Sequence, residues 1–239
     1  MPELPTPLPP GERTVGQAIG ETIRAYGNNF WPLLPLGLAY AVVDQACVHR
    51  SYGPTAVIYW AATPLFVLAY VRACALLLEA SVTRAAVIVA VLVYLPFPAL
   101  HAGYILPGLA WFALVGLAVP AALVERIGVR DALRRGRELG RADYIHSLGS
   151  LAALVVVVGI AEITLGALLH TQSGASARVA LFLADLVLTP MLYVGGAMLY
   201  TDQAARVGSP RSDRRRADAD LHPSFDPDAA GGADPQGQS

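Results

Sequence analysis

Lysine is absent from this 239-residue chain, acidic and basic residues together make up only 15% of it, and there are just two cysteines. The scarcity of charge excludes an ordinary soluble domain, in which charged residues are about 25% of the chain. Cys47 and Cys74 both lie inside apolar runs, which excludes a small secreted scaffold held by disulfides. All seventeen basic residues are arginine, which points to a GC-rich genome more than to any chemistry.

The short motifs of common catalytic sites are also missing. The chain contains no H-E-x-x-H, G-x-S-x-G, Walker A or glycine-rich dinucleotide-binding motif. Its five histidines do not have the spacing of metal ligands. We therefore expect no enzymatic activity, no catalytic residue, no metal site and no cofactor.

Apolar residues dominate instead, at 55% of the chain. A helix that crosses a hydrocarbon core of about 30 Å needs about 20 residues, and its backbone must be hydrogen-bonded internally. The sequence therefore predicts an all-α fold, a polytopic transmembrane helix bundle of about six spans. The predicted spans are residues 30–48, 55–78, 85–101, 103–124, 148–170 and 179–200.

The region 85–124 has two interpretations. It runs forty residues without Asp, Glu or Arg, and a single helix of that length would be about 60 Å long, twice the thickness of the hydrocarbon core. We place the reversal near Pro96, Pro98 and Gly103, because proline disfavours continuous helix and glycine permits a turn. Since 85–101 is short for a full crossing, a re-entrant hairpin is the alternative.

The distribution of arginine predicts the orientation. With six spans, fourteen of the seventeen arginines fall on the side that holds both termini, and the opposite loops hold only Arg50 and Arg178. The positive-inside rule places the arginine-rich side in the cytoplasm. Residues 1–13 contain no apolar signal-peptide core, and 203–239 are polar and rich in Pro, Gly and Asp. We expect two disordered cytoplasmic ends around one transmembrane domain, residues 14–202, in a bacterial inner membrane.

Two segments outside the spans have the periodicity of interfacial amphipathic helices. Residues 14–28 place apolar side chains at helical spacing, with Thr14 as the N-cap and Gly27 as the stop. Residues 126–144 combine an apolar stripe with guanidinium groups that can reach anionic headgroups. An ordinary loop that only sets topology is the alternative for this second segment. Its candidate lipid- or partner-binding residues are Arg126, Arg130, Arg134, Arg135, Arg137 and Arg141.

Three acidic residues, Asp44, Glu162 and Asp185, lie inside predicted spans, all in the outer half of the bilayer. An ionisable residue at the centre of a span costs about 2.5–3.5 kcal/mol on insertion and therefore tends to face the bundle interior. One hypothesis is an outward-facing polar pocket that holds a cation or a proton. The alternative is interhelical hydrogen bonding, or pairing with Arg178 and Arg50.

Residues 120–139, PAALVERIGVRDALRRGREL, resemble a recurring pattern in bacterial six-helix membrane proteins of unknown function. In that family a span ends in glutamate, here Glu125, and a glycine, here Gly128, precedes a helix of the form A-L-x-R-S/G-x-x-L. The family is related to the membrane domain attached to some glycerophosphoryl diester phosphodiesterases. Where the pattern often has serine, this chain has Gly136.

Two further stretches carry the same resemblance. Residues 14–30 are similar to the family's opening interfacial helix, and Tyr200-Thr-Asp202 to its closing Y-x-D. The resemblance implies a membrane fold and no catalysis, because a phosphodiesterase would need a further soluble barrel domain.

Taken together, these patterns predict a non-enzymatic integral membrane protein of the bacterial cell envelope, an accessory or scaffold component. Its expected partners are membrane lipids, a membrane-protein partner or further copies of itself, and not nucleic acid. A small transporter or lipid-handling protein that uses the outer acidic residues is the alternative.

Overall fold

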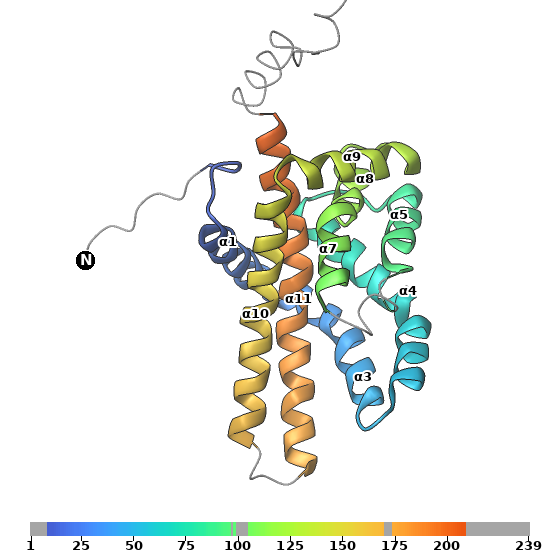
Figure 1. Ribbon diagram of the computed structural model, residues 1–239, viewed down its shortest axis with the longest axis vertical. Helices are drawn as coiled ribbons and strands as arrows, with labels where there is room; N and C mark the ends of the chain where they lie inside the picture. The colour runs from blue at the N-terminus through green and yellow to red at the C-terminus, as the bar shows by residue number, and fades with distance from the viewer. Residues whose placement is uncertain (1–8, 97, 99–104, 170–173, 209–239) are drawn as a thin grey trace, which may run out of the picture.

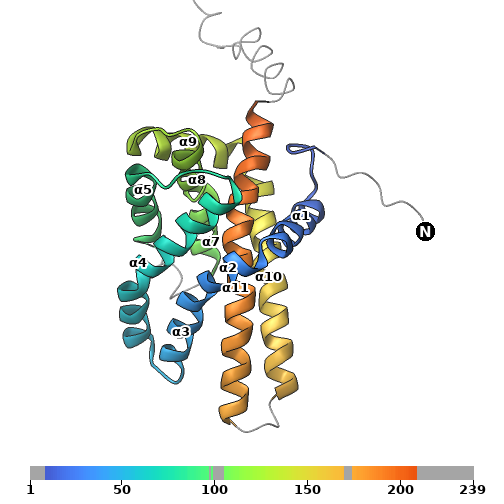
Figure 2. The same cartoon turned by 180° about the vertical axis from the view of Figure 1, so that it is seen from behind.

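The computed structural model describes residues 9–96, 98, 105–169 and 174–208, and the regular structure in these ranges is entirely helical, which confirms the predicted all-α class. Figures 1 and 2 show the arrangement. The elements are α1 (Val15–Asn28), α2 (Phe30–Leu33), the 3-10 helix η1 (Leu34–Gly37), α3 (Leu38–Cys47), α4 (Tyr52–Leu77), α5 (Arg84–Tyr94), α7 (Ile105–Val115), α8 (Ala118–Val124), α9 (Val129–Ala142), α10 (Tyr144–Leu169) and α11 (Gly174–Val207).

In the described ranges, four segments are long and apolar enough to cross a membrane: Tyr52–Leu77, Leu106–Val124, Tyr144–Leu169 and Gly174–Val207. They correspond to four of the six predicted spans. The other two are not among these four segments. The first is divided into α2, η1 and α3, and the helix of the third, α5, has 11 residues, about 16 Å. Part of the predicted 85–101 span lies outside the described residues.

The first predicted span breaks because of its prolines and one glycine. Pro35 lies in the first turn of η1, where its missing N–H ends the preceding helical hydrogen bonding. A Cβ on Gly37 would collide with the backbone of Leu186, so only glycine permits this close approach to α11. The 3-10 turn η1 therefore lies where the chain approaches α11 closely.

Helix α7 contacts α5 and approaches the middle of α11. The Trp111 indole N–H donates to the Val93 carbonyl at 2.9 Å, and a Cβ on Gly196 would lie 3.3 Å from the Phe112 ring. Ile105, where α7 begins, is seven residues beyond Phe112, or about 10 Å along the axis. The described part of α7 therefore covers less of the bundle's length than α10 and α11 do (Figures 1 and 2).

The break between α7 and α8 is compensated inside the core. Pro120 has no N–H to donate to the Gly116 carbonyl four residues earlier. The hydroxyl of Tyr70 donates to that carbonyl at 3.3 Å, and the Val119 N–H does so at 3.3 Å. Tyr70 is fully buried, and its ring packs edge-on against Phe112, with centroids 5.2 Å apart. A buried hydroxyl thus supplies a second donor to a carbonyl that lacks its usual i+4 partner.

Helix α1 forms where the sequence predicts a helix and has the predicted cap. Thr14 and Gln17 form a reciprocal capping box, and the helix ends at Asn28, one residue after the predicted stop at Gly27. A Cβ on Gly195 would lie 3.8 Å from Thr22, and the Tyr26 hydroxyl donates to the Val187 carbonyl at 2.6 Å. Helix α1 therefore runs obliquely along the middle of α11 (Figure 2).

The two helices predicted to be interfacial lie at different levels. Helix α9 shares a groove with Val207, the last residue of α11, whereas the middle of α1 lies beside Gly195. Twelve residues of helix separate these two levels, or about 18 Å. Of the two, α9 is the helix that lies at the end of the bundle (Figure 1).

Candidate functional site: the arginine-bearing end of the bundle

Helix α9 is held against the bundle by small residues. Ala132, Gly136, Leu139 and Gly140 are its buried face. A Cβ on Gly136 would lie 2.6 Å from the backbone nitrogen of Ala118, and one on Gly140 would lie 2.7 Å from the Leu114 carbonyl oxygen. Any side chain at position 136 would push α9 away from α8. Gly136 and Gly140, which belong to the predicted apolar stripe, therefore pack against α8 and α7.

An open groove runs along the opposite flank of α9. Its volume is about 740 Å³. Four arginines line it at the spacing i, i+4, i+7 and i+11, which places them on one helix face. The lining residues are Arg130, Leu133, Arg134, Arg137, Glu138, Arg141, Ala142 and Val207.

The guanidinium groups of the groove are mostly uncompensated. Arg134 pairs with Asp131 at 3.2 Å, and both side chains are exposed. Among the described residues, no acidic side chain lies within ion-pair distance of Arg130, Arg137 or Arg141. Such a row of positive charge beside apolar surface suits the phosphate groups of an anionic ligand.

The other two predicted arginines have different surroundings. Arg126 is exposed and does not line the groove. The Arg135 Nε donates to Glu125 Oε1 at 3.1 Å, and its Nη1 lies 3.1 Å from Glu138 Oε2. The Tyr200 hydroxyl donates to the same Glu125 oxygen at 3.1 Å. Arg135 therefore links α9 to α11 and is not available to a ligand in the way the groove arginines are.

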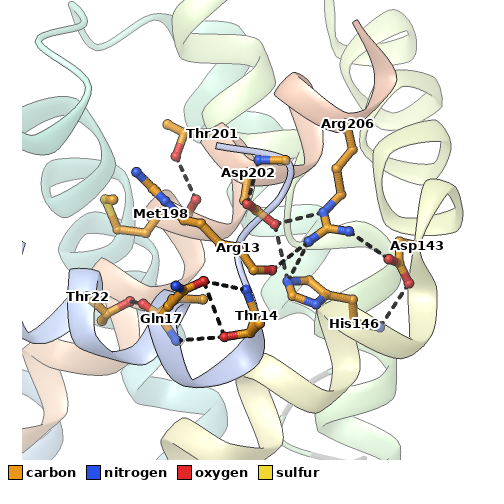
Figure 3. Close-up of polar contacts among 12 residues, drawn as sticks. Arg13, Thr14, Gln17, Thr22, Asp143, His146, Met198, Thr201, Asp202 and Arg206 are labelled. Atoms are coloured by element: carbon orange, nitrogen blue, oxygen red, sulfur yellow. Dashed lines mark hydrogen bonds and ion pairs between the residues drawn. The ribbon is translucent and has the colours of Figure 1, made fainter. Parts of the chain in front are cut away.

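A second polar cluster, around Asp202, lies near the same end (Figure 3). The Asp202 side chain is only 3% exposed. Its Oδ1 accepts from the Gly11 backbone N–H at 2.9 Å, and its Oδ2 accepts from Arg206 Nε at 3.0 Å. The same Oδ2 lies 3.2 Å from His146 Nε2. One carboxylate thus contacts the segment before α1 and the helices α10 and α11.

Arg206 extends this cluster in two directions. Its Nη1 donates to Asp143 Oδ2 at 2.9 Å, and its Nη2 donates to the Arg13 carbonyl at 2.9 Å. The other Asp143 oxygen accepts from the His146 backbone N–H at 3.1 Å, in the first turn of α10. The cluster therefore joins three segments that are far apart in the sequence. We call Asp143, His146, Asp202 and Arg206 the ionic cluster.

The acidic residues of the predicted spans are partly brought together. Asp44, Glu162 and Asp185 lie close enough for their carboxyl groups to influence one another electrostatically. Asp185 is 5% exposed, and its Oδ2 is enclosed without a hydrogen-bond partner. Within the described ranges, no three His, Cys, Asp or Glu side chains are placed to hold a metal ion. In the part of the chain that the structure describes, these acidic residues form no ion pair with Arg50 or Arg178, whose Nε atoms donate to the Ala46 and Gly174 carbonyls.

Sequence reasoning did not identify the ionic cluster, although one signal was present. Asp202 and Arg206 are four residues apart at the end of a predicted span, the spacing of a helical ion pair. His146 and Asp143 carry no comparable signal, because they reach the cluster only through the packing of α10 on α11.

Comparison with protein-family models, curated proteins and solved structures finds no match to this chain. The resemblance to the six-helix membrane proteins therefore stays a prediction from the sequence.

Proposed function

We propose that this chain is a non-enzymatic integral membrane protein of the bacterial inner membrane, an accessory or scaffold component whose α9 arginines contact anionic lipid headgroups. Four long apolar helices support the membrane assignment. The observation that carries the rest is the arginine groove, in which four guanidinium groups line one face of a helix at the end of the bundle. A protein partner with an anionic surface is the other ligand that this groove suits.

The placement of charge supports an orientation with this end in the cytoplasm. Arg13, Arg206 and the α9 arginines all lie at the end where α11 finishes. Arg50 and Arg178 lie at the opposite ends of α3 and α11. Each arginine near an anionic leaflet contributes about 1 kcal/mol of attraction. If α5, α7 and α8 form a re-entrant hairpin, the four crossings are the segment from α2 to α3, α4, α10 and α11. Both chain ends then lie on the same side of the membrane.

Thiol labelling in sealed spheroplasts tests this orientation. Gln172→Cys lies between α10 and α11, and Ser212→Cys follows α11. A membrane-impermeant maleimide is expected to label the first variant in intact cells and the second only after lysis. Labelling of Ser212→Cys in intact cells would overturn the orientation.

Vesicle binding tests the ligand. The purified protein in detergent is mixed with vesicles of phosphatidylglycerol or phosphatidylcholine and separated by flotation. The variant R137Q/R141Q removes two charges from the groove, and R84Q/R126Q removes two exposed charges from the same end outside it. We expect the groove variant to lose more phosphatidylglycerol binding than the control variant, because both lose the general attraction of about 1 kcal/mol per arginine and only the groove variant also loses charge-assisted hydrogen bonds to phosphate. Equal losses would refute a groove-specific contact.

A small transporter is a second candidate, and the proximity of Asp44 to Asp185 favours it. Asp185 directly precedes Leu186, whose backbone lies against Gly37 of η1. Discontinuous helices beside buried polar groups are common in transporters. Replacing Asp44, Glu162 and Asp185 by their amides should preserve the fold. If these residues carry protons or cations, the variant should lose the proton or cation flux that the unaltered protein shows in proteoliposomes. A flux that is unchanged in the variant would show that the three acidic residues are not the transport pathway.

A further inference from the structure

The arginine groove opens where α11 ends. Val207, the last residue of α11, lines it together with Arg137 and Arg141. The exposed positive face of α9 is therefore adjacent to the point from which the chain continues beyond Gly208. Any segment that follows in the sequence is tethered beside these guanidinium groups.

The charges beyond Gly208 are segregated along the sequence. Four arginines come first, at positions 211 and 214–216, with one aspartate, Asp213, among them, and residues 217–239 contain no Arg or Lys and five aspartates. Four of these aspartates surround two apolar residues, Leu221 and Phe225, within a short stretch. We call residues 217–228, ADADLHPSFDPD, the acidic segment; its aspartates are Asp218, Asp220, Asp226 and Asp228.

We propose that the acidic segment binds in the arginine groove of its own chain. The four aspartates are opposite in sign to the groove arginines, of which Arg130, Arg137 and Arg141 have no ion-pair partner among the described residues. Leu221 and Phe225 match the apolar lining at Leu133 and Val207. The arginine row is about 16 Å long, at 1.5 Å per residue over eleven residues.

The linker makes this contact geometrically accessible. The nine residues from Gly208 to Arg216 span up to about 30 Å when extended, and the excess of four arginines over one aspartate favours extension. A tether of this length gives an effective concentration in the millimolar range. Weak individual ion pairs are therefore sufficient for substantial occupancy.

Docking has a consequence for lipid binding. The same guanidinium groups cannot contact the aspartates and a phosphate at once, so the acidic segment competes with anionic lipid for the groove. This consequence rests on the proposed function, whereas the docking itself does not.

A spin label tests the docking directly. Ser224→Cys places one label in the acidic segment, in a Cys47→Ser background, since Cys74 is fully buried. In detergent without anionic lipid we expect a slow-motion spectrum. Fast motion is expected when the four aspartates are changed to asparagine and in R137Q/R141Q, while R84Q/R126Q keeps the slow spectrum. Fast motion in the otherwise unaltered chain, or the same spectrum in both arginine variants, would overturn the proposal.

Vesicle binding separates this inference from the proposed function. Phosphatidylglycerol vesicles should release the label, and the four-asparagine variant should bind them about threefold or more tightly, given the millimolar tether. If the label is fast in every protein while R137Q/R141Q still weakens vesicle binding, docking fails and the lipid contact stands. If the label is docked and released as expected but no arginine variant changes vesicle binding, docking stands and the lipid contact fails.

Discussion

Asp202→Asn should destabilise the protein far more than the loss of an exposed carboxylate does. The Asp202 side chain is 3% exposed and contacts Gly11, His146 and Arg206. Asparagine keeps an oxygen that can accept from the Gly11 N–H, but it removes the charge that faces Arg206. The substitution therefore isolates the electrostatic part of the ionic cluster.

The expected magnitude follows from burial. Removing one partner of a fully buried ion pair costs about 3–5 kcal/mol, because the other charge is left uncompensated. The Arg206 side chain is 20% exposed and keeps Asp143 as a partner. We therefore expect a loss of about 2–3 kcal/mol in the free energy of unfolding, or several degrees in Tm at about 2–4 °C per kcal/mol for a chain of this size.

The assay is SDS-induced unfolding in detergent micelles, followed by circular dichroism of the helices. Asp131→Asn is the matched control, because the Asp131–Arg134 pair has side chains that are 56% and 81% exposed. Exposed pairs are worth about 0–1 kcal/mol, so this variant should unfold close to the unaltered protein. Equal losses in the two variants, or no loss in Asp202→Asn, would refute the reasoning that the cluster holds the three segments together.

Three further predictions concern packing and are measured by the same unfolding assay. Gly136→Ala should lower the free energy of unfolding by about 1–3 kcal/mol, because its Cβ would meet Ala118 and force α9 outward. Gly159→Ala is the control: a Cβ there has nothing within 4 Å, so the variant should be neutral or more stable. Equal effects of the two substitutions would contradict the contact between Gly136 and Ala118. Gly37→Ala should be at least as costly as Gly136→Ala because it meets the Leu186 backbone, and a neutral result would mean that η1 does not lie against α11. Tyr70→Phe should cost about 1 kcal/mol by leaving the Gly116 carbonyl short of a donor, and a stabilising effect would argue against this hydrogen bond.

The long apolar helices and the N-cap of α1 were predictable because they depend on local signals. Runs of about 20 apolar residues predicted four segments that the structure confirms as long enough to span, and Thr14 caps α1 as expected. The division of 30–48 was not predicted, although Pro32 and Pro35 were visible, because proline is often tolerated in membrane helices. What decides the break is the approach of Gly37 to Leu186, a contact between segments 149 residues apart.

The candidate site shows the same limit. The spacing of the α9 arginines predicted a positive helix face, and the structure places four of the six along one groove. The separate position of Arg135 could not be foreseen, since it depends on Glu125 and Tyr200 meeting α9. The proximity of Asp44 to Asp185 likewise depends on how α3 crosses α11.

Native mass spectrometry of the protein extracted gently from its own membrane tests the central claim most directly, because it reports retained lipids and bound proteins together. We expect the full chain to retain anionic phospholipid, R137Q/R141Q to lose it, and R84Q/R126Q to keep it. Retention that is equal in all three proteins, or a chain that carries only neutral lipid, would contradict an anionic-lipid contact through the α9 groove.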